Sequence, residues 1–245
     1  MKRPPSFHGM VVELLHGDRW AKTYLIHDGT STSVALVDPV YDSLDEDLAM
    51  LEDRGLTLTH AIATHTHADH ITACFEMRNR TGCAYIMWKD TASLGVSDYV
   101  DESSACMVGN LEVRFHFAPG HTSDSMIVEA DGHILTGDFL FTGAGGVGRD
   151  DLPSGRVDVH WEALNVLDRF PGTAVVCTGH DPPGTEMMTL AWNREHNPIL
   201  SMTDVDEFRA WQAETSARLG SVSKIKVALP ANLFAEVPAV VPWLD

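Results

Sequence analysis

The chain has 245 residues, of which 44% are hydrophobic, and carries a formal net charge of −18. This length and apolar content allow a full hydrophobic core and exclude a chain that is disordered throughout. The negative charge argues against nucleic acid as a partner, because binding to phosphate backbones depends on Lys and Arg side chains. No apolar run reaches the roughly 18 residues of a membrane-spanning helix, so we expect no membrane partner.

The cysteines and the N-terminus indicate the compartment. None of the four cysteines is part of a Cys-x-x-Cys pair: Cys74, Cys83, Cys106 and Cys177. This spacing favours reduced thiols in the cytoplasm over a disulfide framework or a zinc ribbon. Met1 to Met10 contains two prolines and no apolar core, so we expect no secretory signal peptide.

Strands and helices alternate in the first half of the chain. Leu44, Leu48 and Leu51 recur at helical spacing before Gly55, and Asp28-Gly29 is a turn signal between two apolar runs. We predict helices at 43–54 and 71–81. We predict strands at 10–15, 23–27, 33–38, 61–63 and 84–88.

The second half repeats this rhythm. We predict a strand at 111–118, a hairpin of 125–130 and 133–136 around Asp131-Gly132, and a strand at 174–178. Helices are predicted at 161–170, 185–196 and 204–218, and the proline-punctuated segment 225–244 is expected to be extended. Strands interrupted by helices indicate a layered α/β fold, and we expect one domain spanning residues 1–245.

Thirteen histidines occur, and five of them share a distinctive position. Each of the five lies in a loop directly after an apolar strand, beside Gly, Thr or Asp: His65, His67, His70, His121 and His180. Asp138 occupies the same kind of position, in Thr136-Gly137-Asp138. We interpret the other histidines as surface or hydrogen-bonded side chains: His8, His16, His27, His60, His116, His133, His160 and His196.

The spacing within Thr64 to His70 has a chemical meaning. On a loop, His65 and His67 can reach one metal from the same side, whereas Asp69 and His70 lie further round and can serve an adjacent metal. Imidazoles and carboxylates suit zinc, iron and manganese, and the absence of cysteine from this cluster excludes a soft thiolate site. The alternative is that these are polar loop residues grouped by chance. His121, Asp138 and His180, which also follow strands, argue against it.

These motifs resemble those of the metallo-β-lactamase superfamily over about residues 10–200. The motifs are His65-x-His67-x-Asp69-His70, Pro119-Gly120-His121-Thr122, Gly137-Asp138 and Gly179-His180-Asp181. The resemblance implies an α/β (α+β) fold, a four-layer αββα sandwich with a metal site at one edge between the sheets. It implies one metal surrounded by His65, His67, His121 and Asp138. A second metal would be surrounded by Asp69, His70, His180 and a bridging Asp138.

Within the superfamily, the chain is most similar to the persulfide dioxygenase (sulfur dioxygenase) and glyoxalase II-like branch. The stretches that resemble persulfide dioxygenases are 146–151 with Gly155, 195–198 and 227–233. Thr66 and Val147 stand where that group commonly has Cys. Pro182 replaces its Tyr, and Phe234 replaces an Arg. The last two changes fall in the expected glutathione pocket and bear on the thiol substrate.

The first hypothesis is therefore a mononuclear Fe(II) enzyme. It would oxidise a glutathione-persulfide-like, low-molecular-weight persulfide to sulfite and thiol. The resemblance implies one iron per chain, bound by His65, His121 and Asp138. The groups that would then orient these ligands are His67, Asp69, His70 and His180. Among the site residues, we predict catalytic roles for Asp69 and His70. Arg149 is the candidate for binding a substrate carboxylate, since a guanidinium can grip a carboxylate bidentately. The alternative for this arginine is a loop-stapling role.

The second hypothesis is a binuclear hydrolase of a thioester, as in hydroxyacylglutathione hydrolase (glyoxalase II), or of a lactone. It would use two metals per chain, with Zn²⁺ or Mn²⁺ as alternatives to iron, and all of the candidate ligands. A third reading, a binding module without activity, is disfavoured because no candidate ligand is missing. The apolar tail, which includes Phe234, Val240 and Trp243, can pack on its own domain or form a homodimer contact.

Overall fold

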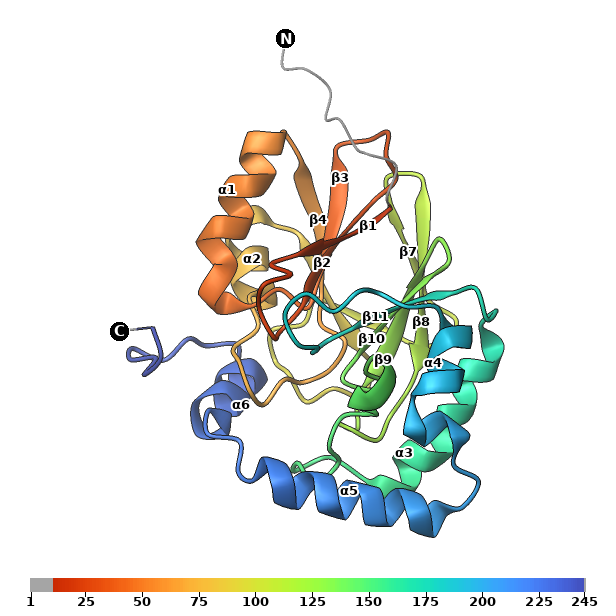
Figure 1. Cartoon of the computed structure of the whole chain (residues 1–245). Coiled ribbons are helices and arrows are strands. Elements are labelled where there is room, and N and C mark those ends of the chain that lie inside the picture. Colours follow the sequence, from red (N-terminus) through yellow and green to blue (C-terminus); the bar gives the residue numbers. More distant parts are fainter. Residues whose placement is uncertain (1–10, 245) are drawn as a thin grey trace.

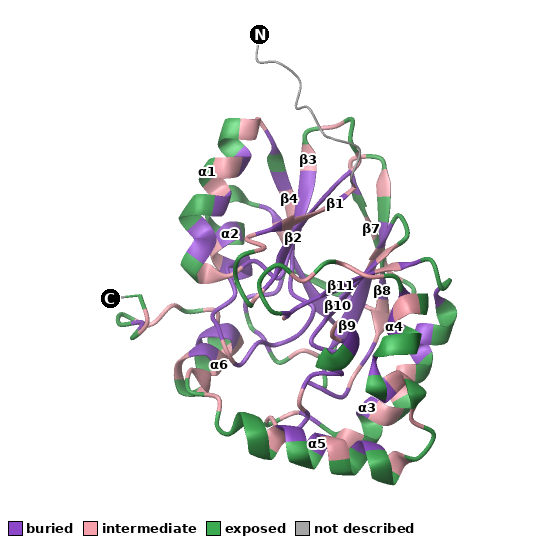
Figure 2. Cartoon of the chain, viewed as in Figure 1, coloured by how far each residue is buried: buried purple, intermediate pink, exposed green. Residues whose placement is uncertain are grey.

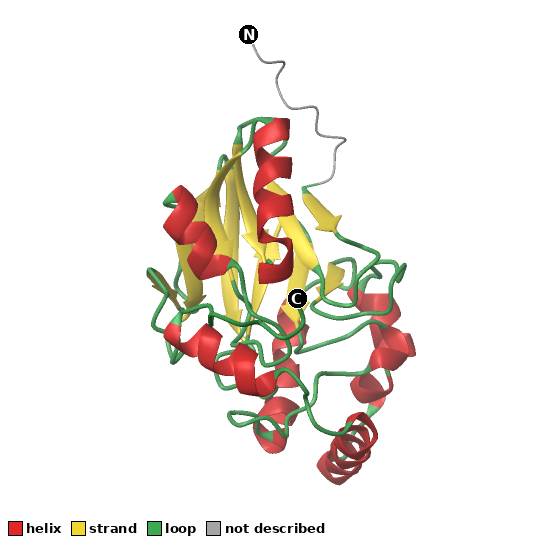
Figure 3. Cartoon of the chain, turned by 90° about the vertical axis from the view of Figure 1, so that its left-hand side faces the viewer, coloured by secondary structure: helices red, strands yellow, loops and turns green. Residues whose placement is uncertain are grey.

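The structure is a computed structural model that describes residues 11–244, so our expectation for Met1 to Met10 lies outside the described residues. Two β-sheets pack face to face, and helices cover the outer face of each (Figure 1). Figure 3 shows helices lying over the outside of one sheet. The four-layer αββα arrangement implied by the resemblance is confirmed.

Within the described residues, the first sheet has six strands in the order β1-β2-β3-β4-β5-β6. They are β1 (Val12–Leu15), β2 (Thr23–His27), β3 (Ser33–Val37), β4 (Thr57–Ile62), β5 (Ala84–Trp88) and β6 (Asp98–Val100). The first three strands are antiparallel neighbours, whereas β3 to β6 run parallel to one another.

The second sheet has five strands in the order β11-β10-β9-β8-β7, again within residues 11–244. They are β7 (Ala105–Val108), β8 (Leu111–Phe117), β9 (Met126–Ala130), β10 (His133–Gly137) and β11 (Val175–Thr178). Only β10 and β11 pair in parallel; the other neighbours are antiparallel.

The helices form the two outer layers. The first sheet is covered by α1 (Leu44–Arg54), α2 (Cys74–Thr81) and α6 (Ile225–Phe234). The second is covered by α3 (Val157–Ala163), α4 (Leu190–His196) and α5 (Val205–Leu219). Short 3-10 turns lie at η1 (Tyr41–Ser43), η2 (Gly143–Gly145), η3 (Leu164–Arg169) and η4 (Pro198–Ser201).

Three buried apolar clusters fill the interfaces between these four layers. Successive side chains of a strand enter different clusters. In β2, Leu25 packs under α1 and α2, while its neighbours Tyr24 and Ile26 point into the space between the sheets. In β10, Leu135 faces the other sheet and Ile134 faces the helices outside. Because successive side chains of a strand point to opposite faces, each strand supplies two clusters at once. Figure 2 shows these central strands as mostly buried.

The topology brings five strand ends to one edge of the sandwich. Parallel strands end on the same side, and β8 runs in the direction of β10 because both are antiparallel to β9. Polar side chains follow these ends in the chain: Asp38 after β3, His65 after β4, His121 after β8, Asp138 after β10 and His180 after β11. The fold therefore collects at one edge groups that are far apart in sequence.

One element contradicts the sequence expectation outright. Residues 225–234 form helix α6, not an extended segment, although Pro230 lies inside it. Ala228, Ala231 and Asn232 are buried at helical spacing, and the two alanines pack against the first sheet's outer cluster. Burial of this face outweighs the hydrogen bond that Pro230 cannot donate.

Two other helices have different bounds from those predicted. Residues 185–189 are not helical, because Met188 O accepts a hydrogen bond from Val176 N (2.9 Å) and the segment runs along β11. Helix α4 begins only after Thr189, whose hydroxyl accepts from Trp192 N at 3.2 Å. The helix expected at 161–170 instead starts at Val157 and continues as the 3-10 turn η3.

The structure also contains two short strands, β6 and β7, that the apolar pattern of the sequence did not predict.

The structure also shows the state of the cysteines and the character of the helices, for which the sequence raised expectations. All four cysteines are free, and Cys74, Cys83 and Cys177 are buried. Among residues 11–244, no helix combines the length and apolar character needed to cross a membrane.

Candidate metal centre

The loop after β4 is anchored by a carboxylate that sequence reasoning did not select. Asp38, buried at the end of β3, accepts hydrogen bonds from Thr64 N and Thr64 Oγ1, both at 2.7 Å. Its Oδ1 also lies 3.2 Å from His67 Nε2. Burial would raise the pKa of Asp38, but the charge of His67 and these hydrogen bonds outweigh it, so its pKa is lowered. Its position after an apolar strand was the available signal, as for Asp138.

A first group of ligand atoms comes from three different loops. One nitrogen each of His65 and His121 and one carboxylate oxygen of Asp138 lie within 4.8 Å of one another. Asp138 Oδ2 is 4.0 Å from His65 Nε2 and 3.6 Å from His121 Nε2. The opposite ring nitrogens are engaged: His65 Nδ1 with Thr64 Oγ1 at 2.9 Å, and His121 Nδ1 with Arg149 O at 2.5 Å. Both rings are thus oriented with Nε2 toward one carboxylate.

A second group lies beside the first. His67, Asp69 and His70 also offer ligand atoms within 4.8 Å of one another. His180 joins the two groups, since its Nδ1 lies 2.7 Å from Asp138 Oδ1 and its Nε2 lies 2.9 Å from Asp69 Oδ2. These two carboxylates raise the pKa of His180 well above its ordinary value, although burial opposes them. The structure therefore brings together every histidine and aspartate predicted as a ligand.

The donor atoms left without partners fit a metal ion. His65 Nε2, His67 Nδ1 and His70 Nε2 are buried and have no hydrogen-bond partner among the described residues. Buried polar atoms are normally satisfied, and such a concentration of orphaned imidazole nitrogens is what a cation would occupy. Burial, followed by the nearby His67, lowers the pKa of His65 to about 3, so this ring is neutral at pH 7, as a metal ligand must be.

A second overlooked carboxylate ties the ligand loops together. Asp124 is buried and accepts hydrogen bonds from Thr66 N (3.2 Å), Thr66 Oγ1 (2.5 Å), Thr91 Oγ1 (2.7 Å) and Thr122 Oγ1 (2.7 Å). Thr66 lies between His65 and His67, and Thr122 follows His121. Asp124 therefore fixes the first ligand loop relative to the loop of His121.

Helix α6 contributes a third support for the same loop. Asn232 donates from Nδ2 to the carbonyls of His67 and His70, both at 2.9 Å. Its Oδ1 accepts from Thr72 N at 2.9 Å. The buried amide thus satisfies backbone groups on both sides of Asp69, which explains why the C-terminal segment folds back onto the centre.

The predicted substrate arginine has other partners in this structure. The Arg149 guanidinium donates to both carboxylate oxygens of Asp151, at 2.6 and 2.7 Å, and to Gly220 O at 2.7 Å. These hydrogen bonds attach the loop that carries Arg149 to Gly220, the residue that follows α5. The backbone carbonyl of Arg149, not its side chain, contacts the centre, through His121. A substrate role for the guanidinium stays a prediction.

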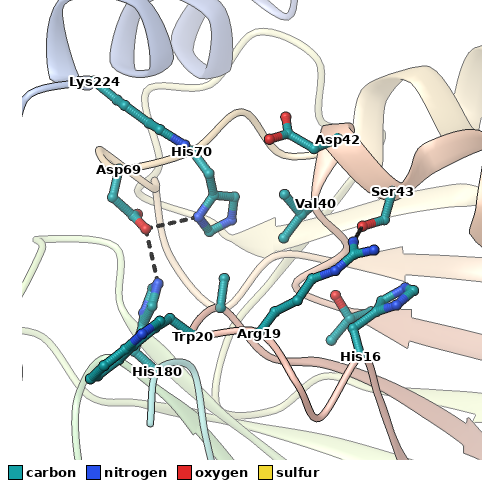
Figure 4. A pocket seen from close by; sticks show the side chains of 12 residues that line it. His16, Arg19, Trp20, Val40, Asp42, Ser43, Asp69, His70, His180 and Lys224 are labelled. Atoms are coloured by element: carbon teal, nitrogen blue, oxygen red, sulfur yellow. Dashed lines mark hydrogen bonds and ion pairs between the residues drawn. The ribbon is translucent and has the colours of Figure 1, made fainter. Parts of the chain in front are cut away.

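A cavity of about 440 Å³ opens beside the centre and gives small molecules access to it. Asp69, His70 and His180 form its inner wall. The outer wall includes Arg19 and Trp20, from the loop between β1 and β2, and Lys224, from the start of α6 (Figure 4). Figure 4 also shows Asp69 lying between the His70 and His180 rings.

Comparisons with known proteins agree with this geometry. Residues 21–180 match the family model described as "Metallo-beta-lactamase superfamily". "Persulfide dioxygenase ETHE1, mitochondrial" of Bos taurus is 27% identical over 215 residues, covering 86% of this chain and 82% of the relative. "Hydroxyacylglutathione hydrolase" of Rhodopseudomonas palustris (strain BisB5) is 30% identical over 229 residues, covering 89% of this chain and 84% of the relative.

A solved structure, "Crystal structure of ETHE1 from Myxococcus xanthus", aligns with a TM-score of 0.84 at 32% identity, covering 92% of this chain and 99% of that one. The fold, the strand-end ligand cluster and the match over residues 21–180 lead to the same family. The chain belongs to the metallo-β-lactamase superfamily.

Proposed function

We propose that this protein is a mononuclear iron enzyme that oxidises a low-molecular-weight persulfide, such as glutathione persulfide, to sulfite and the free thiol. The observation that carries the proposal is the cluster of His65, His121 and Asp138, whose ligand atoms lie within 4.8 Å of one another. Two imidazoles and one carboxylate on one side of a metal leave positions open for a sulfur substrate and oxygen. The likeness to persulfide dioxygenases supports it.

Bound Fe(II) would supply the one-electron chemistry with O₂ that protein side chains cannot perform. The overall reaction consumes one persulfide, one O₂ and one water, and yields one thiol and one sulfite with release of protons. The terminal sulfur is oxidised and O₂ is reduced, so the reaction balances without another reductant.

We call His65, His121 and Asp138 the triad, and the contacts of the residues around it suggest what those residues do. Asp138 Oδ1 contacts His180 Nδ1, His180 Nε2 contacts Asp69 Oδ2, and Asp69 Oδ2 contacts His70 Nδ1. This chain of hydrogen bonds runs from the triad to the cavity wall. We assign Asp69 and His70 the task of receiving protons released as the sulfur is oxidised, and His180 the task of orienting Asp138.

A second candidate is a binuclear hydrolase of a glutathione thioester. The specific observation in its favour is the second group, in which His67 Nδ1 and His70 Nε2 are buried beside Asp69 with no hydrogen-bond partner among residues 11–244. A second metal at this position would help to activate a bridging water. The likeness to hydroxyacylglutathione hydrolases supports this alternative.

One experiment separates the two functions. Anaerobically purified protein is given glutathione persulfide, oxygen uptake is recorded, and iron and zinc are counted on the same sample. Rapid uptake with about one iron per chain is expected. No uptake in a sample with two metals per chain, together with hydrolysis of S-lactoylglutathione, would replace the proposal with the hydrolase.

The variant His70→Ala sharpens the distinction. It removes a residue of the second group but none of the first. A dioxygenase should keep its one iron, with oxygen uptake slowed by the loss of a proton acceptor but not abolished, whereas a binuclear hydrolase should lose a metal and its activity together.

A further inference from the structure

We propose that Lys224 and Arg19 determine substrate specificity by binding the carboxylate groups of an acidic thiol carrier, the part of the substrate that bears the reactive sulfur. The inference rests on the proposed function only in placing that sulfur at the metal centre. Both residues line the cavity beside Asp69, His70 and His180. The chain has 35 acidic residues and only 17 Lys and Arg, so two basic side chains in one cavity form a local exception to its negative charge.

Lys224 is available to an anion. It precedes α6 and is half-buried, and within residues 11–244 it forms no ion pair. Its ammonium lies 4.6 Å from the centroid of the Trp243 ring, and Trp243 Nε1 in turn donates to Asp42 Oδ1 at 3.2 Å. The C-terminal segment thus positions the lysine without neutralising it. Figure 4 shows the side chain reaching into the cavity on the side of His70.

Arg19 approaches from the opposite wall. Its guanidinium donates to Ser43 Oγ and to Glu46 Oε2, the latter at 3.0 Å. Glu46 has 61% of its side chain exposed, and exposed ion pairs of this kind contribute little energy. A guanidinium has five N–H donors, so a substrate carboxylate can bind without breaking the bond to Ser43.

The acidic side chains of the cavity have donors of their own. Asp69 lies between His70 and His180, and Asp42 accepts from Trp243. Asp69 is thus paired with two imidazoles, whereas Asp42 accepts from a neutral indole N–H and keeps its negative charge. Among the described residues that line the cavity, Lys224 and Arg19 are the Lys and Arg side chains, and both have N–H donors left for an anionic ligand.

The wall that carries Arg19 is already fixed in position. Lys22 Nζ donates to Gly17 O (3.3 Å) and Arg19 O (2.5 Å) within the same loop. Lys22 N donates to Gly179 O at 2.8 Å, and Ala21 forms a β-bridge with His180. This loop is therefore tied to the loop of a candidate ligand, and binding does not incur the cost of ordering it.

The test measures binding of an unreactive ligand, so that it does not depend on turnover. Metal-loaded protein is titrated by calorimetry with S-methylglutathione and with its dimethyl ester, which lacks both carboxylates. Lys224→Met and Arg19→Met are compared with matched controls, Lys226→Met and Arg114→Met, which remove exposed charges away from the cavity. Ester binding also reports whether each variant keeps a folded cavity.

We expect the acid to bind more tightly than the ester, and each cavity variant to weaken acid binding about tenfold while leaving ester binding unchanged. The controls should match the wild type. In persulfide oxidation, the cavity variants should raise KM with little change in kcat. Equal affinities for acid and ester, no measurable binding of the acid, or acid binding that is unaffected in both cavity variants would overturn the inference.

The outcome is distinguishable from failure of the proposed function. Carboxylate-dependent binding that is lost in both cavity variants, in a protein that consumes no oxygen with any persulfide, would support the specificity site and refute the dioxygenase.

Discussion

Asp38 Oδ1 lies 3.2 Å from His67 Nε2, and this contact decides which nitrogen of His67 faces the candidate metal centre. With Nε2 held by the carboxylate, Nδ1 is the buried ring nitrogen that has no partner in the described part of the chain. Neighbouring His65 is oriented in the opposite sense, through Thr64 Oγ1 at its Nδ1, and leaves Nε2 free. Residues outside the candidate ligand set therefore orient the ligands, as is general for histidine metal sites.

The first prediction concerns Asp38→Ala. The change removes the acceptor for two donors of Thr64 and the partner of His67, all of them buried. We expect unfolding to cost about 3 kcal/mol less and metal affinity to fall roughly 10–100-fold. Urea denaturation of the metal-free protein and competitive metal titration measure the two effects. The Asp38→Asn variant keeps one acceptor, so its stability and metal affinity should lie between those of the wild type and Asp38→Ala. Wild-type metal affinity in Asp38→Ala would contradict the assigned role.

The second prediction concerns His121→Ala. His121 Nε2 faces Asp138, so its loss should remove a ligand and abolish activity under either proposed function. We expect a loss of metal affinity greater than the roughly 10–100-fold typical of groups that only orient ligands. His133→Ala serves as the control, since His133 is partly exposed on β10, away from the cluster. Metal counting with activity on the same samples checks it, and full activity in a metal-bound His121→Ala protein would refute the site.

The third prediction concerns Asp124→Ala. Thr66 and Thr122 would each lose the acceptor for a buried hydroxyl, and half-buried Thr91 would lose one as well, so the two ligand loops would lose their common tie. The expected loss of stability is about 2–4 kcal/mol. Ser123→Ala, an exposed change one residue away, should have almost no effect. Chemical denaturation of both variants provides the comparison, and equal midpoints would show that the hydrogen bonds to Asp124 are not what holds these loops.

The fourth prediction concerns pH. Burial, together with the charge of Asp151, raises the pKa of Asp150 to about 6, and its buried Oδ2 has no hydrogen-bond partner within residues 11–244. A carboxyl whose pKa is raised on folding stabilises the folded state while it is protonated, below its unfolded pKa of about 4. That contribution is lost as pH rises from about 4 to about 6.

Asp150→Asn should therefore be as stable as the wild type near pH 4 and more stable, by up to about 2 kcal/mol, above pH 6. Free energies of unfolding at pH 4.5, 5.5, 6.5 and 7.5 measure the difference between the two proteins. Asp168→Asn, at an exposed position, controls for the change in net charge. A constant difference across this pH range would mean that Asp150 titrates alike in the folded and unfolded chain.

The sequence alone determined the layered fold and the identity of the candidate ligands. Short apolar runs, many of them bounded by turn residues, predicted most strands, and the polar side chains that follow them, such as His65, His121 and Asp138, predicted the cluster. Strand ends are readable because the hydrophobic pattern stops there, and the spacing of His65, His67, Asp69 and His70 is local.

Tertiary structure decided the rest. Asp38 and Asp124 gain their roles from partners in other loops, and Arg149 turns to Asp151 and Gly220 instead of the cavity. Helix α6 forms against its local signal because it buries Ala228 and Ala231 on the first sheet. Lys224 and Arg19, which are 205 positions apart in the sequence, line the same cavity. Such long-range contacts are governed by packing and burial of the whole chain, which no local pattern of residues records.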